Sequence, residues 1–399
     1  MREKGWQMAD PKLYLAIDNC FAYKRWTRPK DWARMIRGLG LRCVEASADT
    51  EMDPLYMGPE YLKRWVSDVQ TVEAAEGVEV VNLYSGHGTY TTLGLAHTDM
   101  AVRRRFVDQW FKPLIDAADA LDSGVGFFVH GFPEFVLQDN NAFEKYTEEL
   151  LEVLSEINAY AAEKQVGPLS IEQMYTPMMH PWTIKETVQY MIAVKQKSGA
   201  CFYFTEDLGH HLAKFIQPCE ADVVAAFAQR RLKGLWLGTD AAYEIYRDAL
   251  AKGELTDSAL HQLLGLMRCG KHLFTEVRDA DCYEWLRAIG CYAPIIHLQQ
   301  TDGTGSAHLP FTKANNEKGK ISGTAVLQAL SDSYNAEPET ETADIQKCDC
   351  VYMTLEPFFS SLSISQDILD DCKESVEYWR RFIPEDGIRL SEAVGRLEL

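Results

Sequence analysis

Short apolar runs alternate with longer amphipathic stretches along the chain. In Tyr146–Glu163, for example, apolar residues recur at helical spacing and acidic residues occupy the positions between them. Eight of the short runs are predicted strands: Leu13–Ile17, Cys43–Ala46, Val78–Leu83, Gly126–His130, Pro168–Glu172, Cys201–Thr205, Pro294–Leu298 and Cys350–Leu355. This alternation indicates α/β architecture with a parallel sheet, and eight units fit a closed (β/α)₈ TIM barrel better than an open sheet.

One connection is far longer than a single crossover needs. The segment Cys219–Gly290, between the sixth and seventh predicted strands, contains several helical stretches of its own. We therefore expect one barrel domain over residues 1–399 with a helical insertion at 219–290, since such barrels run from about 200 to beyond 400 residues. The chain has neither the glycine fingerprint of a dinucleotide site nor a phosphate-binding P-loop.

The charge of the chain argues against nucleic acid as a partner. It carries 59 acidic residues against 40 Lys and Arg, a formal net charge of −19, which repels a phosphate backbone. The run Arg103-Arg104-Arg105 lies in a helical stretch and is expected to be a solvated helix face.

Apolar runs and cysteine spacing exclude further classes of protein. The sequence has no apolar run of 18 residues and no signal-type apolar core after Met1, so we expect a cytoplasmic protein without a membrane partner. Its ten cysteines include no C-x₂-C pair, which argues against a zinc ribbon or a thioredoxin motif.

Four residues able to bind a metal lie at or just after the ends of the fifth to eighth predicted strands: Glu172, Asp207, His297 and Glu356. Strand ends of a barrel converge on one mouth, where barrel enzymes keep their active sites. Each residue alone is explained by capping, a salt bridge or core hydrogen bonding. Three carboxylates brought together repel one another unless a cation neutralises them. Oxygen-rich ligands with one imidazole suit one divalent ion, Mn²⁺ first, with Mg²⁺, Co²⁺ or Zn²⁺ as alternatives.

These residues also carry a resemblance to a known family. Glu172, Asp207-Leu208-Gly209-His210, His297 and Glu356-Pro357-Phe358 resemble the motifs of the xylose-isomerase-like sugar isomerases and epimerases, which include tagatose/psicose 3-epimerases. The resemblance follows strand order over nearly the whole barrel, and the Asp-x-Gly-His element is its most distinctive part. It implies that the four residues hold one metal and that Glu172 and Glu356 are also acid/base catalysts on opposite sides of the substrate carbon. It implies that His210 contacts the substrate oxygen next to the carbonyl.

The expected function is that of a divalent-metal-dependent isomerase or epimerase of a small carbohydrate or sugar phosphate. Proton transfer would pass through a metal-stabilised enediolate. The same site could serve a lyase or dehydratase acting on a 3-oxo-sugar or glycoside, because an enediolate can expel a neighbouring group. An endonuclease-IV-like DNA repair enzyme shares the barrel but needs three zinc ions and more histidines, and a non-catalytic barrel would not need Glu172 and Glu356. By analogy with related barrels, we expect a homo-oligomer.

The chain departs from the family pattern at two positions. Met178 and Gly303 stand where the epimerases place a glutamate and an arginine, so the loop Gln299–His308 is expected to supply replacement contacts. Additional candidates for substrate binding follow other strands or lie in that loop: His87, His130, Glu45, Trp182 and His308. For His87, His130 and Trp182, a purely structural role stays open.

Overall fold

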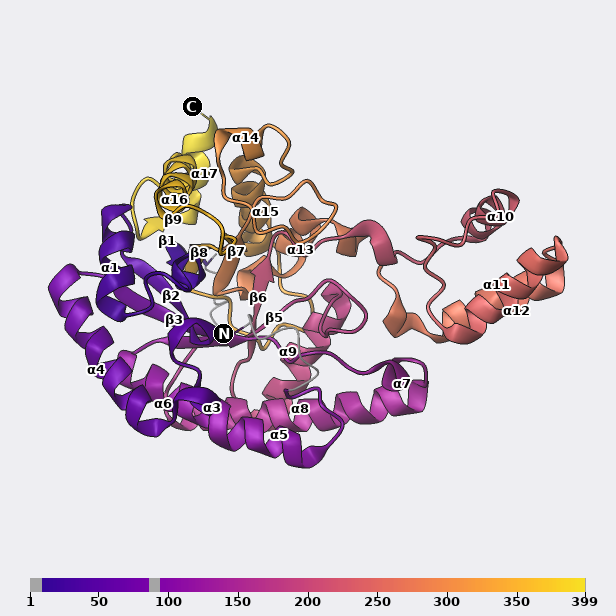
Figure 1. The fold of residues 1–399 in the computed structure, drawn as a ribbon, viewed down its shortest axis with the longest axis horizontal. Helices are drawn as coiled ribbons and strands as arrows, with labels where there is room; N and C mark the ends of the chain where they lie inside the picture. Colours follow the sequence, from indigo (N-terminus) through magenta and orange to yellow (C-terminus); the bar gives the residue numbers. More distant parts are fainter. Residues whose placement is uncertain (1–8, 86–93, 399) are drawn as a thin grey trace, which may run out of the picture.

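A closed parallel barrel forms the centre of the protein (Figure 1). The computed structural model describes residues 9–85 and 94–398. The eight barrel strands are β1 (Lys12–Asp18), β2 (Cys43–Ser47), β3 (Glu79–Ser85), β4 (Gly124–Phe127), β5 (Leu169–Glu172), β6 (Tyr203–Asp207), β7 (Ile295–Leu298) and β8 (Cys350–Leu355). Each strand pairs in parallel with the next, and β1 pairs with both β2 and β8, which closes the barrel. The predicted (β/α)₈ fold is confirmed.

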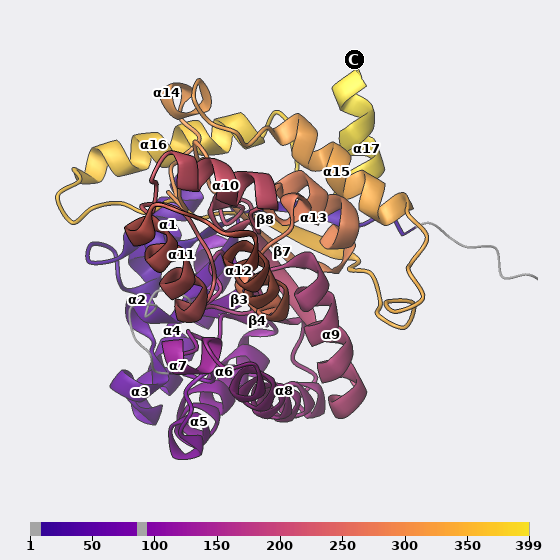
Figure 2. The ribbon, with the colours of Figure 1, turned by 90° about the vertical axis from the view of Figure 1, so that its right-hand side faces the viewer.

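Helices surround the strands (Figures 1 and 2). The α-helices are α1 (Pro29–Gly38), α2 (Ala48–Glu51), α3 (Pro54–Met57), α4 (Pro59–Glu76), α5 (Met100–Phe106), α6 (Lys112–Leu121), α7 (Glu134–Leu137), α8 (Asn140–Glu163), α9 (Ile184–Ser198), α10 (Glu220–Ala228), α11 (Asp240–Lys252), α12 (Asp257–Cys269), α13 (Cys282–Ile289), α14 (Lys313–Asn316), α15 (Gly323–Asn335), α16 (Ser365–Trp379) and α17 (Leu390–Gly395). A short strand β9 (Ile388–Arg389) runs antiparallel to β1. Among the described residues, no helix is both long and apolar enough to cross a membrane.

The sequence explains helix α8 well. Asp139 caps its N-terminus by accepting hydrogen bonds from two backbone N–H groups of the first turn. Leu150, Leu154, Ile157 and Ala161 recur every three or four residues and are buried against the barrel. The amphipathic pattern therefore places α8 in the outer ring of helices.

The predicted boundaries of β3, β4 and β6 were wrong by two residues or more at one end at least, and β3 runs to Ser85 instead of Leu83. β4 was predicted as Gly126–His130 but spans Gly124–Phe127, because two glycines, which have low strand propensity, are used here to admit a neighbouring side chain. β6 was predicted as Cys201–Thr205 but runs on to Asp207, so its polar end belongs to the strand. Barrel pairing with β7 extends as far as Asp207 and holds that end in the sheet.

The long connection between β6 and β7 leaves the barrel through a narrow neck. Ile216 and Thr275 form a parallel backbone bridge there. The helices α10, α11 and α12 between these two residues extend away from the barrel (Figure 1). The predicted insertion 219–290 spans these three helices and also α13, which packs against α9 and α15 in the outer ring. The inner side of α13 is buried and includes Trp285, Leu286 and Ile289.

A buried glutamate predicts a measurable pH dependence of stability. Glu51 in α2 is 3% exposed and accepts hydrogen bonds from Trp32 and Asn19, and burial raises its pKa to about 8. This pKa is higher in the folded protein than the ordinary value of 4.5 that Glu51 has in the unfolded chain. The contribution of Glu51 to the free energy of unfolding is therefore fully present below pH 4.5 and is lost as the pH rises towards 8. The loss is on the order of 1.4 kcal/mol for each pH unit in that window.

The Glu51→Gln variant should lose this part of the pH dependence of the free energy of unfolding, because the amide keeps an acceptor oxygen and cannot ionise. Urea unfolding of both proteins between pH 5 and about 9 measures the difference, which should favour the variant at alkaline pH. Parallel pH curves for the two proteins would contradict the assignment.

Candidate active site

The ends of strands β5 to β8 bring the four predicted ligands together. Glu172 ends β5, Asp207 ends β6, His297 lies in β7 and Glu356 directly follows β8. One potential ligand atom from each residue lies within 4.8 Å of those of the other three, and all four residues are buried. Asp207 and His297 are direct partners in the register of β6 and β7. The closure of the barrel thus creates one group, here called the ligand group.

The imidazole of His297 lies between the carboxylates of this group. Its Nδ1 is 3.1 Å from Glu172 Oε1, 3.3 Å from Glu356 Oε2 and 3.9 Å from Asp207 Oδ2. Its Nε2 points the other way, to Glu45 Oε2 at 2.8 Å. One nitrogen therefore faces the carboxylates, and the other faces a residue behind the ring.

Crowding of the carboxylates shows in their pKa values. Burial raises the pKa of Glu356 well above its ordinary value, and the charges of Asp207 and Glu172 raise it further against the effect of His297. Burial also acts to raise the pKa of Asp207, but the nearby histidines outweigh it and lower that pKa. Among the ion pairs of the described residues, only histidines face Glu172, Asp207 and Glu356.

The ligand group fits a divalent cation. Glu356 Oε2 is buried, and among the described residues it accepts no hydrogen bond and has only ion-pair contacts with His297 and His308. Three carboxylates and one imidazole are ligands that a hard or borderline ion accepts. Glu172, Asp207, His297 and Glu356 are the residues that would hold it.

Gln299 holds Asp207 in place, a role that the sequence did not reveal. Its Nε2 donates to both carboxylate oxygens of Asp207, at 2.7 and 2.9 Å, and the backbone N–H of Gly209 donates to Oδ1 at 2.7 Å. A Cβ at position 209 would lie 2.2 Å from Gln299 Cδ. Glycine in the Asp-x-Gly-His element therefore leaves the space through which Gln299 reaches Asp207.

Tyr84 is a second residue that the sequence did not reveal. Its hydroxyl donates to Glu172 Oε2, and its ring meets that of His297 edge-on, with centroids 5.0 Å apart. It stands next to last in β3, so its strand-end position was the signal that could have found it. The contact gives Glu172 and Glu356 different surroundings, since within residues 9–85 and 94–398 nothing donates a hydrogen bond to Glu356 Oε2.

His210 and His308 lie beside the ligand group. His210 Nε2 is 3.6 Å from Asp207 Oδ2, while its Nδ1 lies 2.9 Å from the carbonyl oxygen of Gln173. His308 Nδ1 is 3.2 Å from Glu356 Oε2, and its ring stacks on Phe358 at 3.8 Å. Both histidines therefore contact carboxylates of the ligand group.

The other predicted substrate contacts are placed differently. Glu45 lies behind His297 and is fully buried, and its contact with substrate stays a prediction. Trp182 donates its indole N–H to the carbonyl of His272 and packs on Phe215. His87 lies outside the described residues.

His130 follows β4 in the left-handed backbone region, with a φ of 67°. Its ring packs against Phe106 and Phe128, and burial lowers its pKa to about 4. Gly94 leaves the space for this ring, since a Cβ there would lie 1.9 Å from His130 Nδ1. His130 is therefore neutral at pH 7, and its role in substrate binding stays a prediction.

The two departures from the family pattern have distinct settings. Met178 is 46% exposed. At Gly303, the side chain of Lys320 occupies the space beside the α-carbon, so that a Cβ would lie 2.3 Å from Lys320 Nζ. A cation from another part of the chain thus stands where the family arginine would begin.

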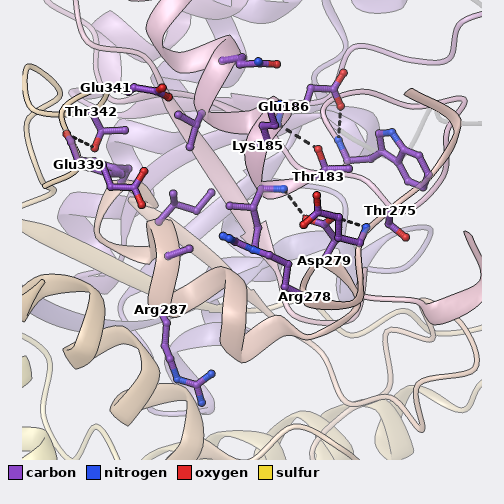
Figure 3. A pocket seen from close by; sticks show the side chains of 18 of the residues that line it. Thr183, Lys185, Glu186, Thr275, Arg278, Asp279, Arg287, Glu339, Glu341 and Thr342 are labelled. Carbon is purple, nitrogen blue, oxygen red and sulfur yellow. Dashed lines mark hydrogen bonds between the residues drawn. The ribbon is translucent and has the colours of Figure 1, made fainter. Parts of the chain in front are cut away.

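A surface pocket of about 870 Å³ opens elsewhere, between α9, α13 and the segment before β8 (Figure 3). Trp182, Glu186, Arg278 and Glu339 are among the residues that line it. None of the four residues of the ligand group does. The chemistry of the ligand group is therefore separate from this pocket.

Fold and ligand group together define a (β/α)₈ barrel with an oxygen-rich site at the carboxyl ends of its strands. Residues 33–235, just over half of the chain, match the family model described as Xylose isomerase-like TIM barrel. The protein belongs to this family.

Other comparisons agree in fold. The chain is 22% identical over 378 residues to D-erythrulose 1-phosphate 3-epimerase of Brucella abortus (strain 2308), covering 92% of this chain and 95% of that protein. A candidate xylose isomerase of Rhodospirillum rubrum superposes with a TM-score of 0.65 at 18% identity, over 92% of this chain and 98% of the other. D-psicose 3-epimerase of Clostridium cellulolyticum H10 gives 0.53 at 13% identity, over 92% and 98%.

Proposed function

We propose that the protein is a divalent-metal-dependent isomerase or epimerase of a small carbohydrate or sugar phosphate. The observation that carries the proposal is the ligand group, in which Glu172 and Glu356 approach the same imidazole nitrogen of His297 from different strands. The sequence relative in Brucella is an epimerase of a ketose phosphate, and it aligns over nearly its whole length. Mn²⁺ is the first choice of metal, with Mg²⁺, Co²⁺ and Zn²⁺ as alternatives.

A metal bound there would polarise the substrate carbonyl and stabilise negative charge on its oxygen. The chain's own residues then move the proton. One of Glu172 and Glu356 removes it from the carbon beside the carbonyl, and the other returns a proton to the opposite face of the enediolate. Tyr84 orients Glu172 through its hydrogen bond to Oε2, and His210, which lies 3.6 Å from Asp207 Oδ2, would hold a substrate oxygen.

The ammonium of Lys320 beside Gly303 offers a cation for a phosphate or a hydroxyl group, in place of the family arginine. A lyase or dehydratase acting on a 3-oxo-sugar or glycoside would use the same carboxylates. A cytoplasmic location and a homo-oligomeric state stay predictions of the sequence.

Solvent exchange tests the proposal. Ketoses, aldoses, 3-oxo-sugars and sugar phosphates are incubated with the Mn²⁺-loaded enzyme in D₂O, and NMR spectra are recorded after the metal is chelated. One substrate class should take up deuterium at a single carbon and give its epimer or isomer. An unsaturated product would identify the lyase, and absence of exchange in every substrate would contradict proton-transfer chemistry.

A further inference from the structure

Glu45 of β2 is held from two sides at the back of His297. Its Oε2 lies 2.8 Å from His297 Nε2, and its Oε1 accepts a hydrogen bond of 2.6 Å from Asn82 Nδ2. All three residues are fully buried. Glu45 and Asn82 are direct partners in the register of β2 and β3, so the barrel itself sets their spacing.

Strand β4 is shaped to admit this arrangement. A Cβ at Gly124 would lie 2.8 Å from Asn82 Oδ1, and a Cβ at Gly126 would lie 2.9 Å from Asn82 Nδ2. Any larger residue at either position would displace Asn82 from Glu45. Gly124 and Gly126, whose low strand propensity led to the wrong predicted start of β4, therefore make room for the side chain of Asn82, which positions Glu45.

Both imidazole nitrogens of His297 lie within hydrogen-bond distance of a carboxylate, Nε2 at 2.8 Å from Glu45 and Nδ1 at 3.1 Å from Glu172. A cation in the ligand group would take the place of a proton on Nδ1, whereas Nε2 would keep its proton and donate it to Glu45. In the neutral ring the lone pair then lies on Nδ1, which is the nitrogen that faces Glu172 and Glu356. Only this tautomer can offer a ligand to a cation in the ligand group.

We propose that Glu45 is a positioning residue, which orients His297 and fixes its tautomer for cation binding, and that it makes no contact with substrate. The proposal rests on the proposed function, because it needs a metal in the ligand group. It assigns to Asn82, Gly124 and Gly126 the task of holding Glu45 in place.

The test compares Glu45→Ala with Glu45→Gln, whose amide oxygen can still accept from Nε2. Titration with Mn²⁺, following the electron paramagnetic resonance signal of the free ion, should show affinity about 10 to 100 times weaker in Glu45→Ala. Glu45→Gln should recover most of the loss. Glu51→Gln is the matched control, because Glu51 is also a buried glutamate but contacts Trp32 and Asn19 instead of His297, and its affinity should be unchanged.

Two further readouts separate positioning from general damage. In the Zn²⁺-loaded parent, the Nε2 proton of His297 should be observed by ¹⁵N-edited NMR in slow exchange with solvent, and in Glu45→Gln it should remain but exchange faster. The His297→Ala spectrum identifies the signal. With saturating Mn²⁺, the KM of Glu45→Ala should return to the parental value, whereas a lost substrate contact would leave it raised.

The results separate failure of the proposed role of Glu45 from failure of the proposed function. Unchanged Mn²⁺ affinity in folded Glu45→Ala, or a KM that stays raised at saturating metal, overturns the role of Glu45 while leaving the metal site intact. If Glu45→Ala does not fold, Glu45→Leu, which fills a similar volume without an acceptor oxygen, is titrated in its place, and parental Mn²⁺ affinity in that variant overturns the proposal. A parent protein that binds neither Mn²⁺ nor Zn²⁺ overturns the proposed function itself.

Discussion

Replacing Glu172 or Glu356 by glutamine should lower turnover by about two to four orders of magnitude while the metal is retained. Glutamine keeps an oxygen that can bind the ion but has no basicity suited to removing a proton from carbon. Steady-state assays with the substrate found by exchange, together with metal analysis of each variant, measure the two effects separately. The Glu51→Gln variant is the control and should keep parental turnover.

The two glutamine variants should also differ from each other. If one glutamate takes the proton and the other returns one on the opposite face, the variant that keeps the first base still incorporates deuterium from solvent without forming product. The different settings of the two carboxylates, with Tyr84 donating to Glu172 alone, make unequal behaviour expected. Near-parental turnover in either variant would contradict the two-base scheme and make His210 the next candidate.

Removing the metal should abolish activity and destabilise the fold. Protein purified without chelator should contain about one divalent ion per chain, and EDTA followed by desalting should reduce activity to background until metal is restored. The apo form loses the stabilisation that ligand binding gives, about 2.7 kcal/mol at a free metal concentration of 100 Kd, so its Tm should fall. Repulsion among the buried carboxylates acts in the same direction.

His297→Ala and Asp207→Ala should weaken metal binding in the same assay and leave the fold largely intact, since both residues lie at strand ends above the barrel core. Activity that survives complete removal of the ion would refute the metal-dependent mechanism. Unchanged affinity in His297→Ala would place the ion outside the ligand group.

The sequence predicted the ligand group because its members share one simple property. Glu172, Asp207, His297 and Glu356 each lie within one residue of the end of a strand, and a barrel brings strand ends together whatever its exact register. The error of two residues at the end of β6 therefore did no harm, because Asp207 was still placed at the mouth.

Supporting residues were harder to predict, because their positions depend on geometry that one strand does not contain. Whether Glu45 meets substrate or the back of His297 depends on the stagger between β2 and β7, across the barrel. Gln299 reaches Asp207 only because Gly209 has no side chain. This contact connects the loops that follow β6 and β7, which are distant in the sequence. Tyr84 required the length of β3 to be known to within one residue.

The backbone bridge between Ile216 and Thr275 makes this point of the chain suited to evolutionary exchange. Because the excursion departs and returns at adjacent positions, a short turn would close the barrel equally well, and each doubling of loop length costs only about 0.6 kcal/mol. Segments of other lengths can therefore be acquired or lost here while Asp207 and His297, the residues on the flanking strands, keep their register. Changes in the length of this segment would thus alter what surrounds the ligand group without changing its geometry.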